Sequence, residues 1–253
     1  MKHAAIAIAL LLVFGAARLP LEIRLRKEQQ AMGFHTATLS LPLRQQLGQM
    51  SFVAALSGFR SLVAAVLWIQ AHEAWQKIDW ARMEGILRTV TTLQPKSILY
   101  WDMSAWHMGW NASIAALEDK KQPSKTLREL KQRSYWELGR KYYEDGLLNN
   151  PDSAALWEGL GIIERDKFED HAAAAKAFAT AATKPNARSY LPRFAAYELA
   201  KVPGREREAY NKLKALYDQG QDERMGTLIH LLKDFEEKLG IPADQRIKED
   251  KAH

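Results

Sequence analysis

The sequence predicts an all-α protein, in which an apolar N-terminal helix is followed by paired helices. Ala, Leu, Glu, Lys, Arg and Gln dominate the chain, and all six are good helix formers. Alternating β-branched residues, which are typical of strands, are rare. Three prolines, Pro95, Pro151 and Pro185, each follow an apolar stretch with helical spacing, so they mark helix ends.

Composition narrows the class of protein. The 253 residues are 47% hydrophobic and 26% charged, which is ordinary for a globular protein and too apolar for general disorder. Because the chain has no cysteine, disulfides, cysteine-based zinc sites and a lipidated cysteine are excluded. The net charge is +6, and the basic residues are interleaved with acidic ones along the chain. This pattern favours solvated helix faces over a surface that binds nucleic acid or anionic lipid.

The apolar N-terminal segment is predicted to be a membrane anchor or a signal. His3 to Ala17 contains no Asp, Glu, Lys or Arg, but it is shorter than the roughly 20 residues of a typical span. A signal peptide would be cleaved after Gly15-Ala16-Ala17. An uncleaved anchor would occupy residues 1–23, with Arg18 reaching the interface. The anchor is favoured, because Arg18 directly follows the only plausible cleavage site.

The side of the membrane is left open by two conflicting patterns. Arg18, Arg24, Arg26 and Lys27 outnumber Lys2, which favours a cytoplasmic location for the rest of the chain. A lone N-terminal apolar segment, however, most often leads a chain out of the cytoplasm. We expect a single-pass protein with an extracytoplasmic domain. The alternatives are a cytoplasmic domain or secretion after cleavage.

Three further regions follow the anchor. Residues 24–42 are predicted to form an amphipathic segment and linker, residues 43–239 a helical-repeat domain, and residues 240–253 a polar tail that frays. Within the domain, residues 52–69 are apolar enough to raise the alternative of a second membrane span. Because Arg60 would lie near the middle of that span at a cost of several kcal/mol, a buried hairpin helix is favoured.

Four helix pairs and a final helix are predicted along the domain. Ser97 and Ser153 follow two of the prolines and are expected to cap the next helices. Pro95 and Pro151 are 56 residues apart, so the second pair is expected to be unusually long. The predicted ranges are 64–77 with 80–93, 98–118 with 125–148, 154–165 with 172–183, 188–201 with 205–217, and 222–239 alone.

The third pair carries a recognisable motif. Trp157, Leu160 and Gly161 form W-x2-L-G, Ala173 follows in the second helix, and Pro185 stands 34 residues after Pro151. This pattern resembles a tetratricopeptide (TPR) repeat. Two positions depart from it: Glu164 stands where an aromatic residue is usual, and Phe178 is one place late.

The same frame extends to the neighbouring pairs. It covers about 130 to 150 residues, with Pro192 expected to break the first turn of the fourth pair. The equivalent positions are Leu67, Ala71, Ala74 and Met83 in the first pair and Trp101, Ala105 and Met108 in the second. The resemblance implies a right-handed stack of antiparallel helix pairs that acts as a scaffold or binds peptides, similar to bacterial membrane-anchored TPR proteins.

The resemblance also implies a concave face on which a protein or peptide partner would bind. Trp68 and Trp75 are seven residues apart and Trp106 and Trp110 are four apart, so each pair is predicted to share a helical face. Packing in the core and contact with a membrane interface are the alternatives for these tryptophans. The predicted partner-binding residues are Trp68, His72, Trp75, Gln76, Asp102, Trp106, Trp110, Glu158 and Arg165.

No motif indicates catalysis. The sequence lacks metal-ligand spacings, a phosphate-binding loop and a nucleophile elbow, and His107 and His171 are isolated along the chain. We therefore expect a non-enzymatic scaffold without cofactor, metal, nucleic acid or small-molecule substrate. The alternative is a structural subunit of an integral membrane complex, with residues 52–69 in the bilayer.

Overall fold

A computed structural model of the chain describes Pro20, Arg24 and residues 59–247. The chain divides into two compact units, residues 1–45 and 46–253, and residues 59–247 belong to the second. The predicted anchor (1–23) and linker (24–42) lie outside the described residues, apart from Pro20 and Arg24. So do the first part of the apolar segment 52–69 and the end of the tail.

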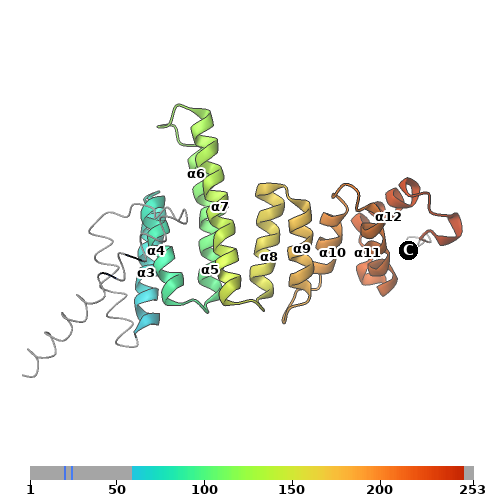
Figure 1. Ribbon diagram of the computed structural model, residues 1–253, viewed down its shortest axis with the longest axis horizontal. Helices are drawn as coiled ribbons and strands as arrows, with labels where there is room; N and C mark the ends of the chain where they lie inside the picture. Colours follow the sequence, from blue (N-terminus) through green and yellow to red (C-terminus); the bar gives the residue numbers. More distant parts are fainter. Residues whose placement is uncertain (1–19, 21–23, 25–58, 248–253) are drawn as a thin grey trace, which may run out of the picture. The chain divides into compact units, whose positions relative to one another are not determined.

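All regular secondary structure in residues 59–247 is helical, which confirms the predicted all-α class (Figure 1). Consecutive helices contact each other along the chain, from α3 with α4 to α11 with α12. The helices are α3 (Arg60–Gln76), α4 (Trp80–Leu93), α5 (Ile98–Trp106), α6 (Ser113–Leu117), α7 (Lys125–Asn149), α8 (Ala154–Ile163), α9 (His171–Ala182), α10 (Leu191–Leu199), α11 (Glu206–Gln219) and α12 (Gly226–Lys238).

Prolines and caps explain most of these bounds. Ser153 caps α8 by accepting a hydrogen bond from Leu156 N at 3.3 Å, as the sequence predicts. Ser97 occupies the equivalent position before α5, but its hydroxyl makes no capping hydrogen bond, so that prediction is wrong. Pro192 does not break α10 but lies in its first turn, where the missing N–H is not needed.

Two π-helical segments interrupt the regular helices. One, η1 (His107–Ala112), joins α5 to α6, and the other, η2 (Glu164–Phe168), follows α8. A π segment bonds each residue to the fifth along instead of the fourth, so it shifts every side chain after it around the helix axis. The sequence gives no warning of this shift. Such segments are frequent at functional sites.

Close helix approaches depend on glycine. At Gly161, the last residue of the W-x2-L-G motif, an added Cβ would lie 2.7 Å from the ring of buried Phe178 on α9. At Gly139 on α7, it would lie 2.9 Å from the Cα and N of Gly109 in η1. In the second case both neighbours are backbone atoms, so α7 crosses η1 at close to the smallest possible separation.

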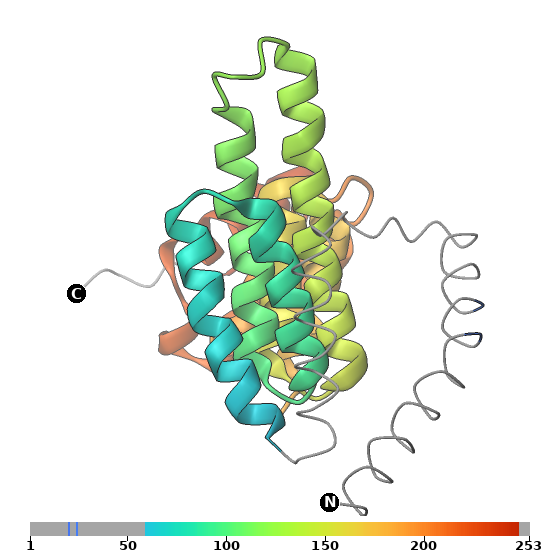
Figure 2. The same cartoon turned by 90° about the vertical axis from the view of Figure 1, so that its left-hand side faces the viewer.

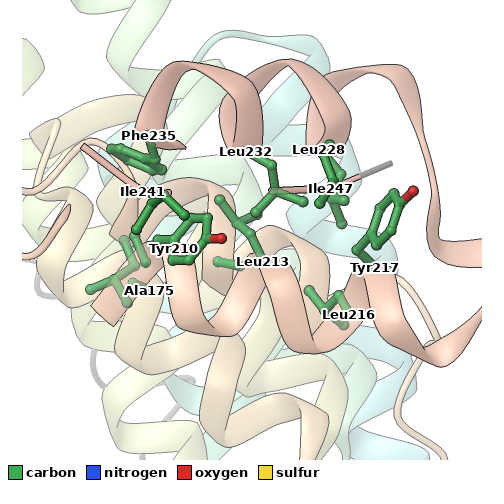
Figure 3. Packing of buried hydrophobic residues seen from close by; sticks show 13 residues of the cluster. Ala175, Tyr210, Leu213, Leu216, Tyr217, Leu228, Leu232, Phe235, Ile241 and Ile247 are labelled. Atoms are coloured by element: carbon green, nitrogen blue, oxygen red, sulfur yellow. The ribbon is translucent and has the colours of Figure 1, made fainter. Parts of the chain in front are cut away.

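The core at the C-terminal end includes part of the predicted frayed tail. Ile241 and Ile247 are buried with Leu213 and Leu232 between α11 and α12 (Figure 3). Ile247 N also donates to the buried Glu236 carboxylate at 2.6 Å. The prediction that residues 240–253 fray is therefore wrong for 241–247, because two isoleucines in a polar segment bury enough apolar surface to hold it.

The first described helix is buried on one side only. Leu67 and Ala71 of α3 pack against α4, whereas Arg60, expected within a buried helix, is exposed at the start of α3. The aliphatic and aromatic side chains Phe59, Leu62, Val66 and Ile69 are also exposed. Among the helices of residues 59–247, none combines the length and apolarity that crossing a bilayer requires.

Candidate functional site: an aromatic groove between α3 and α5

Four of the predicted partner-binding positions lie at one surface groove. Trp68, His72 and Trp75 repeat at helical spacing on α3, and Trp106 ends α5 opposite them. We call this feature the aromatic groove; it has a volume of about 310 Å³. Its lining residues are Trp68, Ala71, His72, Trp75, Met83, Met103, Trp106 and His107.

Two tryptophans of the aromatic groove are exposed. The exposed fractions are 37% for Trp75 and 42% for Trp106, whereas Ala71 and Met83 are almost fully buried beneath them. Both indoles therefore leave part of their surface open to solvent, which the alternative of full burial in the core does not predict. An exposed indole leaves a large apolar surface in water, and Trp is enriched where proteins bind partners.

His107 lies between these two indoles and is almost fully buried. Its ring contacts Trp106 edge-on at 5.0 Å and Trp75 at 6.1 Å between ring centroids. The Asn111 amide nitrogen lies 3.1 Å from His107 Nδ1, which places Nδ1 as the acceptor and a proton on Nε2. Burial, and then the charge of His72, lowers the pKa of His107 to about 4. The imidazole is therefore neutral at pH 7.

Polar groups line one edge of the aromatic groove. The Gln76 amide lies 3.2 Å from His72 Nε2, and the His72 ring lies 5.2 Å from the ring of Trp75. Both His72 and Gln76 are exposed. The lining includes no Asp, Glu, Lys or Arg, so the aromatic groove offers apolar surface and hydrogen bonds but no formal charge from those residue types.

Trp68 stands apart from the exposed pair. Its ring is partly buried and lies 5.2 Å from the ring of Tyr100 on α5. This contact joins α3 to α5 beside the aromatic groove. Tyr100 is not among the residues that the sequence predicts for the site.

Asp102 and Glu158 are occupied by internal contacts. Tyr143 on α7 donates to Asp102 at 3.0 Å, and burial together with the charge of Glu158 raises the pKa of Asp102. Glu158 is buried and pairs with Arg188 at 3.0 Å, while Tyr190 also donates to it. These two predicted binding residues thus join α5 and α7 and connect α8 to the start of α10, and no residue of this cluster lines the aromatic groove.

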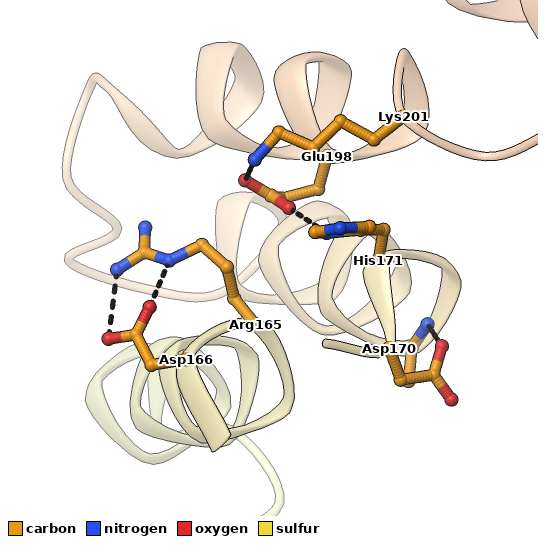
Figure 4. A network of polar contacts seen from close by, with 7 residues as sticks. Arg165, Asp166, Asp170, His171, Glu198 and Lys201 are labelled. Carbon is orange, nitrogen blue, oxygen red and sulfur yellow. Dashed lines mark hydrogen bonds and ion pairs between the residues drawn. The ribbon is translucent and has the colours of Figure 1, made fainter. Parts of the chain in front are cut away.

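The two predicted residues in π segments also lie elsewhere. Trp110 in η1 is not part of the aromatic groove; Lys167 of η2 lies 5.0 Å above its ring. The spacing of four residues from Trp106 therefore does not place Trp110 at the aromatic groove. Arg165 in η2 pairs with its neighbour Asp166 at 2.6 Å (Figure 4).

A second polar cluster lies beside Arg165 and has a structural role. Glu198 on α10 is buried, and its two oxygens meet His171 Nδ1 at 2.7 Å and Lys201 Nζ at 2.9 Å (Figure 4). Both carboxylate oxygens are therefore satisfied, as a buried charge requires. In residues 59–247, no set of three or more His, Asp or Glu side chains is placed to hold a metal ion.

Sequence reasoning missed His107 and Met103. His107 looks isolated in the sequence, because no other residue close to it along the chain suggests a site. Its environment arises only when α3 brings Trp75 beside it. The adjacent Trp106 is the only local signal.

Comparison of this chain with protein families, with curated proteins and with solved structures finds no match.

Proposed function

We propose that this chain is a membrane-anchored helical-repeat scaffold that binds a protein or peptide partner through the aromatic groove. One observation carries the proposal: Trp75 and Trp106 are exposed, and both contact the ring of the buried, neutral His107. Hydrophobic exposure of this kind is costly without a partner, and aromatic residues dominate binding hot spots. The proposal includes no catalysis, since the aromatic groove brings together no acid, base or nucleophile with a complementary partner.

A recurring contact supports the TPR-like repeat within this proposal. Trp101 Nε1 donates to the carbonyl of Pro95 at 2.9 Å, and Trp157 Nε1 donates to that of Pro151 at 3.0 Å. In both cases the tryptophan follows the proline by six residues. The helix pair after Pro95 and the helix pair after Pro151 therefore begin with the same local structure, as repeats of one supersecondary unit do. The pair after Pro95 is the longer of the two.

The lining of the aromatic groove indicates the chemistry of the partner. Because indole and thioether groups and the neutral imidazole of His107 line it, the bound segment should present apolar side chains without charge. His72 and Gln76 at its edge can hydrogen-bond a peptide backbone. A volume of about 310 Å³ suits a short peptide segment rather than a whole helix.

The test is partner capture by the full chain in detergent. Trp75→Ala and Trp106→Ala are each expected to weaken capture about thirtyfold, because hot-spot tryptophans are worth about 2 kcal/mol or more. Both side chains are exposed, so helicity measured by circular dichroism should change little. Leu148→Ala is the matched control, since Leu148 is more exposed still and lies outside the aromatic groove. Unfolding of both tryptophan variants, or undiminished capture, would count against the proposal.

One observation favours the alternative of a subunit embedded in a membrane complex. An exposed apolar face covers the first part of α3: Phe59, just before the helix, and Leu62, Val66 and Ile69 repeat at helical spacing, up to Glu73. In this alternative lipid or a neighbouring subunit would cover that face. In that case, polar substitutions on the α3 face should release the chain from its complex, and substitutions in the aromatic groove should not.

A further inference from the structure

The hairpin formed by α6 and the first half of α7 extends beyond the neighbouring helices (Figures 1 and 2). None of the residues 125–138 on α7 is buried, and burial begins at Gly139. α6 packs on α7, and the two helices are joined by residues 118–124. We call residues 114–131 the hairpin tip. Ala116 is the one buried residue of the hairpin tip, so the composition of the remaining, solvent-facing residues indicates its role.

The hairpin tip exposes aliphatic side chains on both helices. Exposed fractions run from 37% for Leu117 to 59% for Leu130. Single exposed leucines are ordinary, but a group of them at the end of one projecting hairpin marks an interaction surface. The residues are Ile114, Leu117, Leu127 and Leu130.

Lysines alternate along the sequence with these aliphatic residues. The hairpin tip carries five Lys or Arg residues and three Asp or Glu residues, a net charge of +2. Its lysines are Lys120, Lys121, Lys125 and Lys131, all exposed. Three of them, together with Lys77 from the end of α3 and the acidic Glu118 and Asp119, line a cleft of about 610 Å³ at the base of the hairpin tip. Arg128 instead donates to the carbonyls of Gln122 and Pro123 and so shapes the turn.

We propose that the hairpin tip binds the surface of an anionic membrane. Its leucines would enter the boundary between headgroups and acyl chains while its lysines contact lipid phosphates, as in interfacial segments that combine an apolar face with lysines. This composition disfavours a protein partner, because Lys is depleted at protein interfaces and Leu is under-represented among hot spots. It also disfavours single-stranded nucleic acid, because residues 114–131 include no aromatic side chain on which a base could stack.

The absence of cysteine from the chain allows a site-specific test. Leu127→Cys in the full chain is labelled with an environment-sensitive fluorophore and mixed with vesicles that carry a shallow spin-labelled quencher lipid. In vesicles containing phosphatidylglycerol the emission should shift to the blue and be quenched. In phosphatidylcholine vesicles both effects should be weak. Leu148→Cys is the control, since Leu148 is exposed at the opposite end of the same helix.

Substitution of lysines tests whether their positive charge contributes to membrane binding by the hairpin tip. Lys120→Gln with Lys121→Gln is expected to reduce the bound fraction of the hairpin tip tenfold or more, because each lysine near an anionic surface changes the equilibrium about fivefold. Equal quenching at positions 127 and 148 would overturn the proposal. So would equal quenching in the two kinds of vesicle, or no quenching in either. Protection of position 127 only by an added protein would instead identify the hairpin tip as a protein-binding surface.

Discussion

Gly139→Ala is expected to lower the free energy of unfolding by about 3 kcal/mol, the upper end of the usual range for overpacking. The new Cβ would lie 2.9 Å from Gly109 Cα and N and 3.0 Å from the carbonyl oxygen of Ala105. A side chain could move aside, but these backbone atoms belong to α5 and η1, so α7 itself must shift. Urea unfolding followed by circular dichroism measures the loss.

A matched substitution across the same contact gives the control. At Gly109→Ala, the nearest atom to the new Cβ is the end of the Ile163 side chain at 3.0 Å, and the next, Gly139 Cα, is 3.8 Å away. Because an isoleucine terminus can move, this change should cost much less, although both glycines gain similarly in helix propensity. Equal losses at the two positions would show that the crossing of α7 and η1 is not the tight contact described. The Gly139 change should also weaken partner capture, since His107 lies in η1.

Acid is expected to destabilise the folded protein through His107. Its pKa is about 4 in the folded protein against 6.5 for an unperturbed histidine, so between these values the unfolded chain binds a proton that the folded chain does not. The stability is therefore complete above pH 6.5 and falls as the pH drops toward 4, by about 3 kcal/mol in total. His107→Gln should remove this part of the pH dependence.

The measurement is the free energy of unfolding at pH 7 and at pH 4.5 for the parent chain and the variant. Burial raises the pKa of Asp102 and of Glu164, so protonation of these two carboxyls on acidification favours the folded protein, whereas protonation of His107 disfavours it. The variant is therefore compared with the parent chain, which carries the same two carboxyls. His230→Gln is the matched control, because His230 is mostly exposed on α12 and the number of histidines is the same. If His107→Gln and the parent lose the same stability on acidification, His107 is not neutral in the aromatic groove.

The helix pattern is largely predictable from sequence because its signals are local. Proline after an apolar stretch, and serine before the next, act within one turn of the helix. The predicted ranges 80–93 and 125–148 agree with α4 and α7 to within a residue. The prediction is wrong where the signal is not local. The last helix begins at Gly226 and not at 222, and Ile241 and Ile247 hold the tail through contacts distant in sequence.

The candidate site is only partly predictable. Regular helical spacing places Trp68, His72 and Trp75 on one face of α3, and the structure agrees. Spacing assigns Trp110 to the same surface as Trp106, but Trp110 does not line the aromatic groove, and its ring instead lies 5.0 Å from Lys167 Nζ of η2. Glu158 is predicted on the partner surface, but its carboxylate is buried against Arg188 and Tyr190, which come from a loop distant in sequence. The partner-binding role of these residues remains a prediction.

The central claim is that the aromatic groove contacts the partner, and photo-cross-linking tests it most directly. A photoreactive amino acid replaces Gln76, which is exposed at the edge of the aromatic groove, or Asn211, which is exposed on α11 and is the control. After irradiation in cells, the Gln76 position should give one discrete cross-linked product that Trp75→Ala and Trp106→Ala abolish. The Asn211 position should give none. Absence of a product at Gln76, or the same product from both positions, would contradict the account.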